Sequence, residues 1–372
     1  MAACWPGDGM TDGLEPATYT EPAALAAEHR AIFARCWQFV GLKSSLANHN
    51  DWLTADLAGR SIVVQNFDGA LSGFGNVCSH RHARLKGECR GNGLLRCPYH
   101  GWTYNSEGVP VGIPGNAEFF GLDRAARRDL ALPPVAVANC GDLVFARLAE
   151  AGPSLAEFLG PYHAILAAAS SCLSVSFAEQ AIIWRCNWKI GVESAIEGYH
   201  VDLIHPESFR DLVSEVLPMT KTGDHSLGPS TLTATATQSL MRIETRLGLA
   251  GLDRSNRYDH YHIFPNLCVT VTAGVTLSVQ IYEPTSPDAT RLRFWLATGA
   301  SAKPAVRDGV MGRSVLGTLA EFNDRVLAED QQISEAVQHG KAYGPPRPAR
   351  LGANEDRILA FHHAWRRWME RS

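Results

Sequence analysis

The stretch CSHRHARLKGECRGNGLLRCPYHGWTY, from Cys78 to Tyr104, constrains the fold of this chain more than any other part of it. It contains a Cys-x-His pair, Cys78 and His80, and a Cys-x-x-His pair, Cys97 and His100. Thiolate and imidazole are side-chain groups that bind soft and borderline metal ions readily. The spacing therefore indicates a metal site to which two short loops each contribute one Cys and one His.

The mixed pairing of these ligands favours a binuclear iron cluster over a structural zinc ion. Structural zinc sites usually combine two cysteines close in sequence with two histidines close in sequence. Here each pair holds one of each, as expected if two thiolates bind one iron of a [2Fe–2S] cluster and two imidazoles bind the other. Neutral imidazoles leave less negative charge on the cluster, which raises its reduction potential. A zinc ion and a chance arrangement are the alternatives.

A second stretch, AIEGYHVDLIHPESF, carries an acid and two histidines near the end of a helix that we expect over residues 191–204. Glu197 and His200 are three residues apart and would share a face of that helix. His200 and His205 are five apart, so they converge only if the helix breaks. Pro206 supplies a break, because the residue before a proline is pushed out of helical geometry.

Two histidines and one carboxylate form the facial arrangement that holds non-haem Fe(II) and leaves positions open for dioxygen and substrate. His200 and His205 would supply the imidazoles. The simpler interpretation is a helix C-terminus that carries histidines because the helix dipole favours positive charge there. The cluster motif favours the iron site, since a redox cluster needs somewhere to send its electron.

Composition limits the class of protein. The chain has 372 residues, enough for two domains, with 45% hydrophobic and 19% charged residues, as in soluble globular proteins. A formal net charge of −4 argues against nucleic-acid binding, which needs a strong basic excess. We see neither an apolar run that could span a membrane nor a signal peptide, and the nine scattered cysteines do not suggest a disulfide scaffold. We therefore expect a cytoplasmic protein.

The pattern along the chain predicts three parts. Residues 1–39 form a tail and a helix that Thr20 would cap, and residues 40–148 form a small all-β domain with an Asp68-Gly69 hairpin. Residues 149–372 mix strands, including the TLTATATQ run from Thr231, with further helices over 309–339 and 354–369. That order predicts an α+β domain with an antiparallel sheet around a long C-terminal helix.

Both motifs resemble those of one known family. CSHRHARL and CPYHGWTY resemble the Rieske cluster motif of Rieske non-haem iron aromatic-ring-hydroxylating oxygenases, and the stretch from Asn187 shares that family's Asn-Trp-Lys start and its His-Pro. The resemblance implies an α (terminal oxygenase) subunit with a Rieske [2Fe–2S] domain over 40–148. A helix-grip (START-like) mononuclear iron domain would follow over 149–372, with residues 1–39 packed on it. The family more often has Gly where this chain has His82, a minor alternative ligand.

The resemblance also implies a third iron ligand on the long C-terminal helix. The family has an acidic residue there with a Gln some turns later, which Asp330 and Gln338 match best. Glu329 directly precedes Asp330 and is the alternative ligand, and Asp324 stands further upstream.

Two further residues take roles by resemblance. The family's acid at the position of Glu197 bridges a cluster histidine and a histidine of the mononuclear site across a subunit boundary, and it fixes the imidazole orientation. Glu197 would do so here, which requires an oligomer, and the family suggests a homotrimer without a β subunit. Asn187 would lie near the iron, although a structural role as a helix cap is an equal alternative.

The implied function is oxygenation. Electrons would come from a separate reductase or ferredoxin, with NAD(P)H acting only through that protein, and O₂ would oxidise a small organic substrate of the aromatic acid or quaternary amine class. Val269, Val271 and Leu277 are apolar candidates for the substrate cavity, but core packing would explain them equally well. A Rieske electron carrier without oxygenase activity and a zinc-stabilised ligand-binding protein are the competing functions.

Overall fold

The computed structural model describes residues 10–149, 151–252 and 255–371, and the chain divides into two compact units. One unit comprises residues 32–158 and 162–167, and the other comprises the remaining residues up to Ala31 and from Ala168 onwards, with residues 159–161. These units place the first boundary a few residues before position 40 and the second about ten residues after position 148. Each unit is described by itself.

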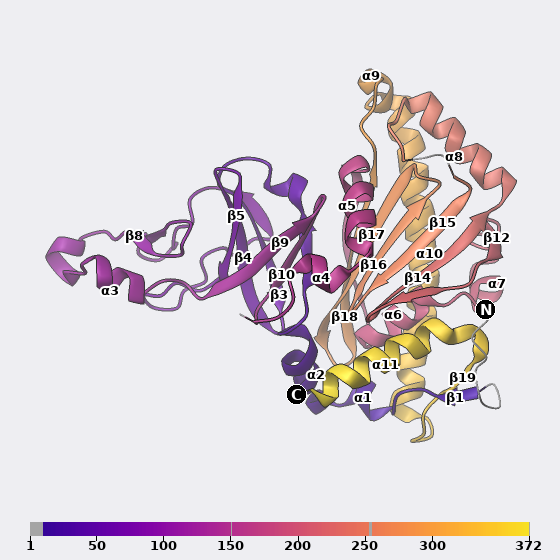
Figure 1. The fold of residues 1–372 in the computed structure, drawn as a ribbon, viewed down its shortest axis with the longest axis horizontal. Helices are drawn as coiled ribbons and strands as arrows, with labels where there is room; N and C mark the ends of the chain where they lie inside the picture. The colour runs from indigo at the N-terminus through magenta and orange to yellow at the C-terminus, as the bar shows by residue number, and fades with distance from the viewer. Residues whose placement is uncertain (1–9, 150, 253–254, 372) are drawn as a thin grey trace. The chain divides into compact units, whose positions relative to one another are not determined.

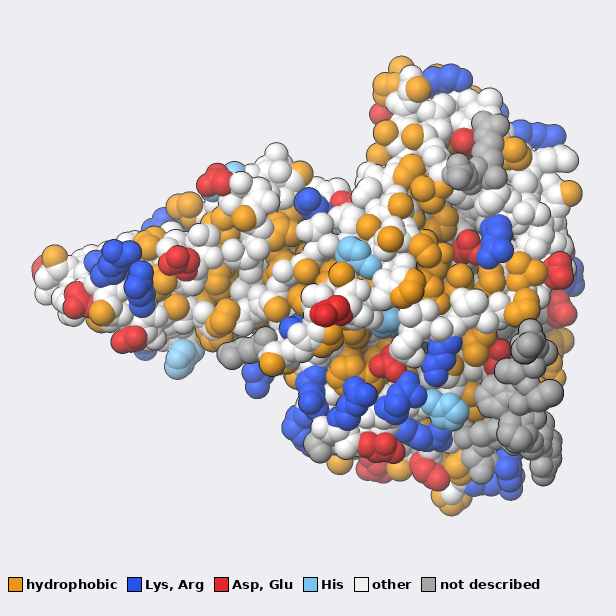
Figure 2. Space-filling view, in the orientation of Figure 1, with side chains coloured by type: hydrophobic (Ala, Val, Ile, Leu, Met, Phe, Trp, Pro, Cys, Tyr) orange, Lys and Arg blue, Asp and Glu red, His pale blue; other side chains and the backbone are white. Residues whose placement is uncertain are grey.

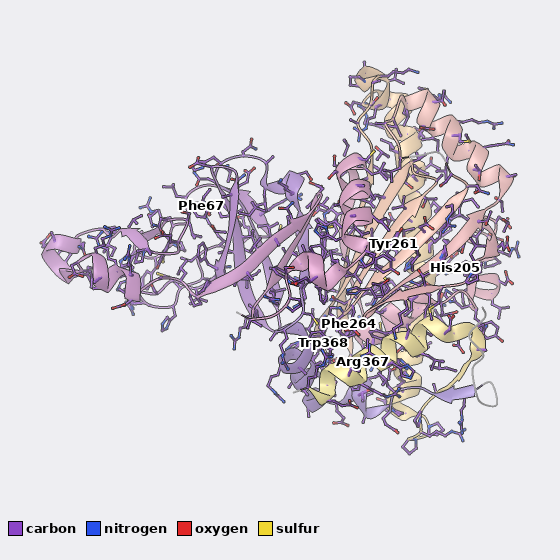
Figure 3. All side chains as sticks on the ribbon, viewed as in Figure 1. Phe67, His205, Tyr261, Phe264, Arg367 and Trp368 are labelled. Carbon is purple, nitrogen blue, oxygen red and sulfur yellow. The ribbon has the colours of Figure 1, made fainter. Side chains whose placement is uncertain are left out.

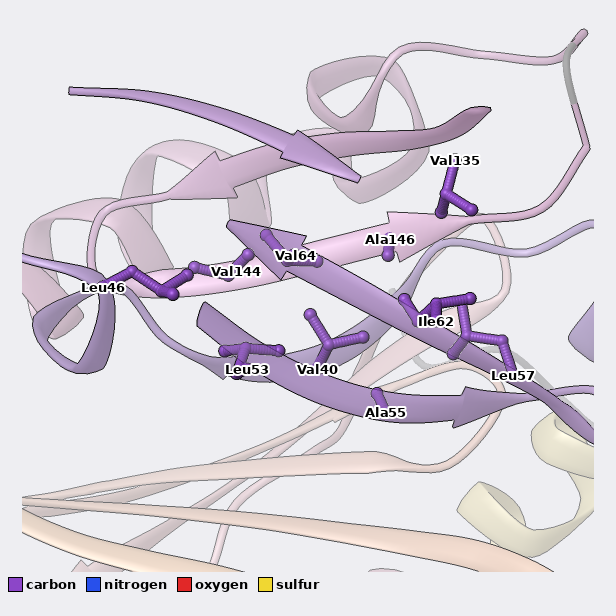
Figure 4. Close-up of a cluster of buried hydrophobic side chains, with 10 residues drawn as sticks. All are labelled: Val40, Leu46, Leu53, Ala55, Leu57, Ile62, Val64, Val135, Val144 and Ala146. Atoms are coloured by element: carbon purple, nitrogen blue, oxygen red, sulfur yellow. The ribbon is translucent and has the colours of Figure 1, made fainter. Parts of the chain in front are cut away.

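The first unit is built on an antiparallel seven-stranded sheet with the order β2-β10-β9-β5-β4-β3-β6. Its strands are β2 Gln38–Leu42, β3 Asp51–Leu57, β4 Arg60–Phe67, β5 Ala70–Gly75, β6 Arg90–Asn92, β9 Pro134–Cys140 and β10 Leu143–Arg147. Asp68 and Gly69 join β4 to β5 with positive φ angles of 53° and 94°, as the hairpin signal predicts. Figure 4 shows the apolar core of this unit, in which Ile62, Val64 and Val144 are fully buried.

Loops beyond the sheet carry the Cys/His motif. A short hairpin of β7 Thr103–Tyr104 and β8 Pro110–Gly112 follows the second ligand pair, and helices α3 Arg124–Asp129 and α4 Leu155–Leu159 complete the unit. Cys78, Cys97 and Trp102 are buried together in a second apolar cluster. The expected all-β domain is therefore present apart from these short helices, and the cysteines of both ligand pairs are buried in its apolar cluster.

The second unit contains an antiparallel eight-stranded sheet with the order β11-β18-β17-β16-β15-β14-β12, and β13 pairs with β14. Its strands are β11 Val175–Trp184, β12 Val213–Val216, β13 Thr220–Thr222, β14 His225–Leu232, β15 Arg257–Ile263, β16 Leu267–Thr272, β17 Thr276–Ser286 and β18 Ala289–Thr298. A separate pair, β1 Met10–Asp12 and β19 Arg350–Gly352, joins the two ends of the chain.

Helices from several parts of the chain pack against this sheet. The unit contains α1 Ala17–Thr20, α2 Pro22–Glu28, α6 Trp188–Ile196, α7 Val201–Ile204, α8 Ala234–Leu247, α9 Pro304–Arg307, α10 Val310–Tyr343 and α11 Asp356–Glu370, and α5 Tyr162–Cys172 enters it from the first unit. Figure 1 shows α10 running along the strands, and α10 packs against α6 and β11. The expected sheet around a long C-terminal helix is confirmed. None of the described helices is both long and apolar enough to cross a membrane.

Two local predictions were wrong. The TLTATATQ run was expected as a strand, but β14 ends at Leu232 and α8 begins at Ala234, where the Thr233 side chain accepts a hydrogen bond from the amide of Ala236. A threonine cap followed by helix-favouring alanine outweighs the β-propensity of the other threonines. Thr20 ends α1 and does not cap α2, whose N-cap is Glu21.

The last helix is fixed by aromatic and ionic contacts. Trp368 of α11 stacks on Phe264, just after β15, with ring centroids 6.1 Å apart (Figure 3). Its indole donates a hydrogen bond of 2.8 Å to Asp224, which also binds Arg367. Figure 2 shows that basic side chains gather on this face of the unit, over the region of α11, with acidic side chains among them.

A buried ion pair attaches the N-terminal segment to the rest of the second unit. Glu28 of α2 accepts hydrogen bonds from Lys189 Nζ at 2.6 Å and from the indoles of Trp188 and Trp365, both at 2.8 Å. Both charged side chains have no solvent exposure. A buried ammonium that lost this partner would retain a large desolvation penalty.

We predict that Glu28→Ala lowers the free energy of unfolding by about 3–5 kcal/mol, because it leaves the Lys189 charge buried and unpaired. Urea denaturation of the purified protein would measure the change. Glu21→Ala, at an exposed position on the same segment, should stay within about 0.5 kcal/mol of wild type. Equal effects of the two substitutions would contradict the assignment.

Candidate functional site

The Cys/His loops of the first unit present two imidazole nitrogens without hydrogen-bond partners in the described part of the chain. Among the described residues, Nδ1 of His80 and Nδ1 of His100 are buried and have no hydrogen-bond partner. Their rings lie 4.7 Å apart between centroids, and the thiols of Cys78 and Cys97 interact with each other. Buried polar atoms are normally satisfied. Two bare imidazole nitrogens beside two buried thiols fit the donor set of a [2Fe–2S] cluster.

Neighbouring side chains hold these ligands in place. Trp102 stacks on the ring of His80 at 4.7 Å, with an angle of 4° between the planes. The Tyr104 hydroxyl lies 3.0 Å from Cys78 Sγ and 3.1 Å from the amide of Ser79. His82 is exposed and has a φ of 59°, a left-handed conformation that suits the glycine more common at this position in the family it resembles.

In the second unit, the helix expected over residues 191–204 breaks earlier than predicted. Helix α6 ends at Ile196 and α7 begins at Val201, so Glu197 and His200 do not share a helix face. Gly198 weakens helix continuation at this point. The turn brings the Glu197 carboxylate onto His200 Nδ1 and also onto the amide of Tyr199.

Three side chains then converge, and we call them the triad: His200, His205 and Asp330. His205 Nε2 lies 3.3 Å from His200 Nε2 and 3.1 Å from Asp330 Oδ1, and His200 Nε2 lies 3.4 Å from Asp330 Oδ1. One donor atom from each residue falls within 4.8 Å of the others. Two imidazoles and one carboxylate at this separation match the facial donor set for non-haem iron.

The electrostatics of the triad suit a cation. Burial alone lowers the pKa of His200, but hydrogen bonds with Asp330 and Glu197 outweigh it and raise the pKa to about 9. Burial alone raises the pKa of Asp330, yet hydrogen bonds from the two histidines leave that pKa below its usual value. A metal ion between the three groups would take over this attraction and displace protons from the imidazoles.

Each imidazole of the triad also has a carboxylate on its outer nitrogen. His200 Nδ1 pairs with Glu197, and His205 Nδ1 lies 2.7 Å from Glu329 Oε2, which also accepts a hydrogen bond from Ser208. Such partners fix the ring orientation and direct the other nitrogen, Nε2, towards the metal. The two neighbouring acids of α10 therefore have different positions: Asp330 is part of the triad, and Glu329 contacts the outer nitrogen of His205.

Asn187 occupies a structural position. Its side-chain oxygen caps α6 by accepting a hydrogen bond from the backbone amide of Lys189, and its side-chain nitrogen donates to the carbonyls of Tyr19 and Pro287. Its backbone amide donates to the side-chain oxygen of Gln338. Asn187 is absent from the described residues that line the cavity at the triad. These contacts support its interpretation as a helix cap and give no support to the catalytic one.

Two neighbouring cavities, which share lining residues, lie at or beside the triad. One, of about 80 Å³, is lined by all three triad residues and by His260, and the other, of about 150 Å³, extends away from it. They share the lining residues Phe209, Tyr258, Thr270, Gln280 and Val326.

The cavity wall is the opposite strand face from the one suggested by the apolar residues. Val269, Val271 and Leu277 are buried, but the lining side chains are Thr270, Thr272, Thr276 and Ser278, which alternate with them. The sequence signal that could have located the cavity wall is a polar residue at every second position of otherwise apolar strands.

Comparison with known proteins identifies both units. A family model described as Rieske [2Fe-2S] domain matches residues 36–133, and one described as ring hydroxylating alpha subunit (catalytic domain) matches residues 174–371.

Two relatives illustrate the range of sequences that the chain resembles. It is 34% identical over 200 residues to the glycine betaine monooxygenase oxygenase subunit of Chromohalobacter salexigens, which covers 52% of this chain and 43% of that protein. It is 30% identical over 196 residues to the anthranilate 1,2-dioxygenase large subunit of Acinetobacter baylyi, covering 50% and 41%. The matched part thus spans less than half the length of these relatives.

Solved structures show the same fold over nearly the whole chain. The quaternary ammonium Rieske monooxygenase CntA superposes with a TM-score of 0.81 at 21% identity, covering 97% of this chain and 96% of that one. Naphthalene 1,2-dioxygenase from Rhodococcus sp. superposes with a TM-score of 0.67 at 21% identity, covering 96% and 94%.

We predict different effects for the two neighbouring acids of α10. Asp330→Ala should abolish binding of one equivalent of Fe(II) or Co(II), because it removes a ligand, whereas Glu329→Gln should retain the stoichiometry with about 10–100-fold weaker affinity. Anaerobic metal titration followed by the Co(II) absorption spectrum measures both. Asp324→Ala, on the same helix, should bind like wild type. Loss of the equivalent in Glu329→Gln but not in Asp330→Ala would reverse the register.

Proposed function

The chain belongs to the ring-hydroxylating α-subunit family, whose model matches residues 174–371 of 372, and from this premise we propose that it is a terminal oxygenase component. In this role it takes electrons from a separate reductase or ferredoxin. It uses dioxygen to hydroxylate or oxidatively demethylate a small organic substrate.

The observation that carries this proposal is the convergence of the triad within 4.8 Å at the end of a cavity. An electron carrier has no need of a second donor set or of a cavity beside it. When bound, a Rieske cluster would supply single electrons, and a ferrous ion at the triad would supply open positions where dioxygen is activated.

The residues of the chain position and insulate this chemistry. Glu197 and Glu329 orient the two imidazoles, and α10 holds Asp330 largely buried, with a side-chain exposure of 13%. The cavity holds substrate beside the triad and limits the water that reaches it. These roles need a fixed geometry, which rigid strands and the long helix supply.

Glu197 is also our candidate for the route of the electron. It lines a second hollow of about 150 Å³ together with His200, Glu193 and Ile358. Its carboxylate oxygens can accept further hydrogen bonds, so a cluster histidine of a neighbouring subunit could bind there. This route would require a homo-oligomer, for which we propose a trimer without a β subunit.

The names of the relatives support a substrate range for the proposal. They include enzymes named for a quaternary amine and for an aromatic acid, glycine betaine and anthranilate. We propose a substrate of this size range.

The experiment is oxygen uptake with a surrogate reductase and a panel of small aromatic and aliphatic compounds that includes acids, quaternary amines and neutral ketones and amides. We predict substrate-dependent uptake in wild type, none in Asp330→Ala, and about a 10–100-fold slower rate in Glu197→Gln, because its amide orients His200 less well and cannot carry the charge of the bridge. The Glu197→Gln protein should keep its iron and its reduced-cluster EPR signal.

Glu207→Gln, an exposed acid in the same segment, is the matched control and should behave as wild type. Zinc in place of iron would indicate a ligand-binding protein. A reducible cluster with no second iron and no uptake would indicate an electron carrier. Undiminished oxygen uptake in Asp330→Ala would refute the assignment of the triad as the iron site.

A further inference from the structure

His260 lies in the wall of the triad cavity, but the roles proposed above do not use it. It is on β15, where Tyr258, His260 and His262 share one face of the strand. Tyr258 and His260 line the 80 Å³ cavity with the triad, whereas His262 packs against Phe361 of α11, with ring centroids 5.4 Å apart. His260 therefore stands between the site and α11.

An arginine behind His260 determines which ring nitrogen carries the proton. Arg357 of α11 is buried, and its Nη2 lies 3.2 Å from His260 Nδ1 and 3.1 Å from the His260 carbonyl. A guanidinium can only donate hydrogen bonds. Nδ1 must therefore accept with its lone pair, and the single proton of a neutral imidazole must be on Nε2.

The fold leaves space for this arginine. Gly228 of β14 pairs with His260 across the two strands, and a Cβ atom at Gly228 would lie 2.4 Å from Arg357 Nη1. Any side chain there would displace the guanidinium. Arg357 also donates to Ser226, two residues earlier on the same strand, at 3.3 Å. The arginine is thus held from several sides at the back of His260.

Charge supports the neutral form of the ring. Burial first, and then the positive charge of Arg357, lower the pKa of His260 well below its usual value. Within the described part of the chain, Nε2 of His260 has no hydrogen-bond partner, and it is not among the buried unsatisfied atoms. Nε2–H is therefore a free donor in the wall of the cavity.

The remaining cavity wall defines the chemical class of ligand. None of the described residues that line the 150 Å³ cavity carries a formal charge. Its aromatic and apolar side chains suit a hydrophobic body, and its threonine, serine and amide side chains suit uncharged polar groups. A carboxylate or ammonium placed there would lack a counter-ion. Asp330 is the only carboxylate among the described residues lining the triad cavity, and it belongs to the triad.

We propose that His260 is a specificity-determining residue whose Nε2–H donates a hydrogen bond to an uncharged oxygen acceptor of the substrate, such as a ketone or amide carbonyl. Arg357 is the positioning residue that keeps the proton on Nε2. This inference rests on the proposed function and narrows it, because within the proposed size range it favours neutral oxygen-bearing substrates over organic acids and ammonium compounds.

The test compares ligands of one skeleton on the iron-loaded protein under anaerobic conditions without reductant. The probes are 1-indanone, indane, 1-aminoindane and indane-1-carboxylate, and their dissociation constants are measured by calorimetry or displacement. Wild type should bind 1-indanone about tenfold more tightly than indane, since one satisfied hydrogen bond in a buried site is worth about that factor. It should bind both charged probes more weakly than 1-indanone.

Variants distinguish the effect of the hydrogen-bond donor on binding from the effect of side-chain packing. His260→Phe should lose the preference for 1-indanone over indane, and His260→Gln, whose amide keeps a donor near the position of Nε2, should retain most of it. His262→Phe, the same substitution two residues along the strand, should leave the preference unchanged. Arg357→Met should relax the discrimination against 1-aminoindane, because the ring can then present a lone pair, an effect that simple loosening of the fold would not produce.

A preference unchanged in His260→Phe, tighter binding of either charged probe, or no measurable binding of 1-indanone at its solubility limit would each overturn the inference. Iron analysis and oxygen uptake on the same samples separate this failure from failure of the proposed function. Protein with its triad iron and substrate-dependent uptake, but with a His260-independent preference, would contradict only the role of His260.

Discussion

The second unit depends on holding one carboxylate against two imidazoles in a largely buried place. Asp330 attracts protonated His200 and His205, and the three groups together form a donor set that a cation would neutralise. Unpaired, each of these groups would oppose burial. The long helix α10 and the broken helix around His200 are therefore coupled, because the charged side chain on each offsets the cost of burying the charged side chain on the other.

Further carboxylates surround the triad and fix the positions of its histidines. Glu197 and Glu329 orient the outer nitrogens of the two histidines, and they come from different elements. The same logic recurs at His260, where the outer partner is a cation, Arg357, and the ring is neutral. An acid behind an imidazole strengthens it as a metal ligand, whereas an arginine behind an imidazole leaves it as a hydrogen-bond donor. The same cavity is thus lined by histidines suited to bind a metal and by one suited to donate a hydrogen bond.

The sequence predicted the parts of this arrangement that depend on short spacing. The Cys/His pairs and the Asp68-Gly69 turn follow from local chemistry, and the structure has that hairpin and places the cluster motif on loops at a β core. Asp330 could be chosen over Glu329 only by resemblance, because helix periodicity does not tell which of two adjacent acids faces inward.

Prediction failed where the outcome depends on contacts that are distant in sequence. The break at Glu197 was placed too late, since Pro206 is a visible signal and Gly198 a weaker one. Hydrophobicity left Val269 and its alternating neighbours equally open as cavity lining or as core, because both faces of that strand are buried. The pairing of Arg357 with His260 requires a glycine on a third element and could not be foreseen from any one stretch.

The central claim is that one polypeptide holds two distinct iron centres. Mössbauer spectroscopy of protein loaded anaerobically with ⁵⁷Fe tests it most directly, because it resolves iron by oxidation state and ligand set. The account predicts a coupled ferric pair with unlike sites, one bound by sulfur and one by nitrogen, together with a separate high-spin ferrous signal. A spectrum with the coupled pair alone, or a protein that takes up zinc and no iron, would contradict it.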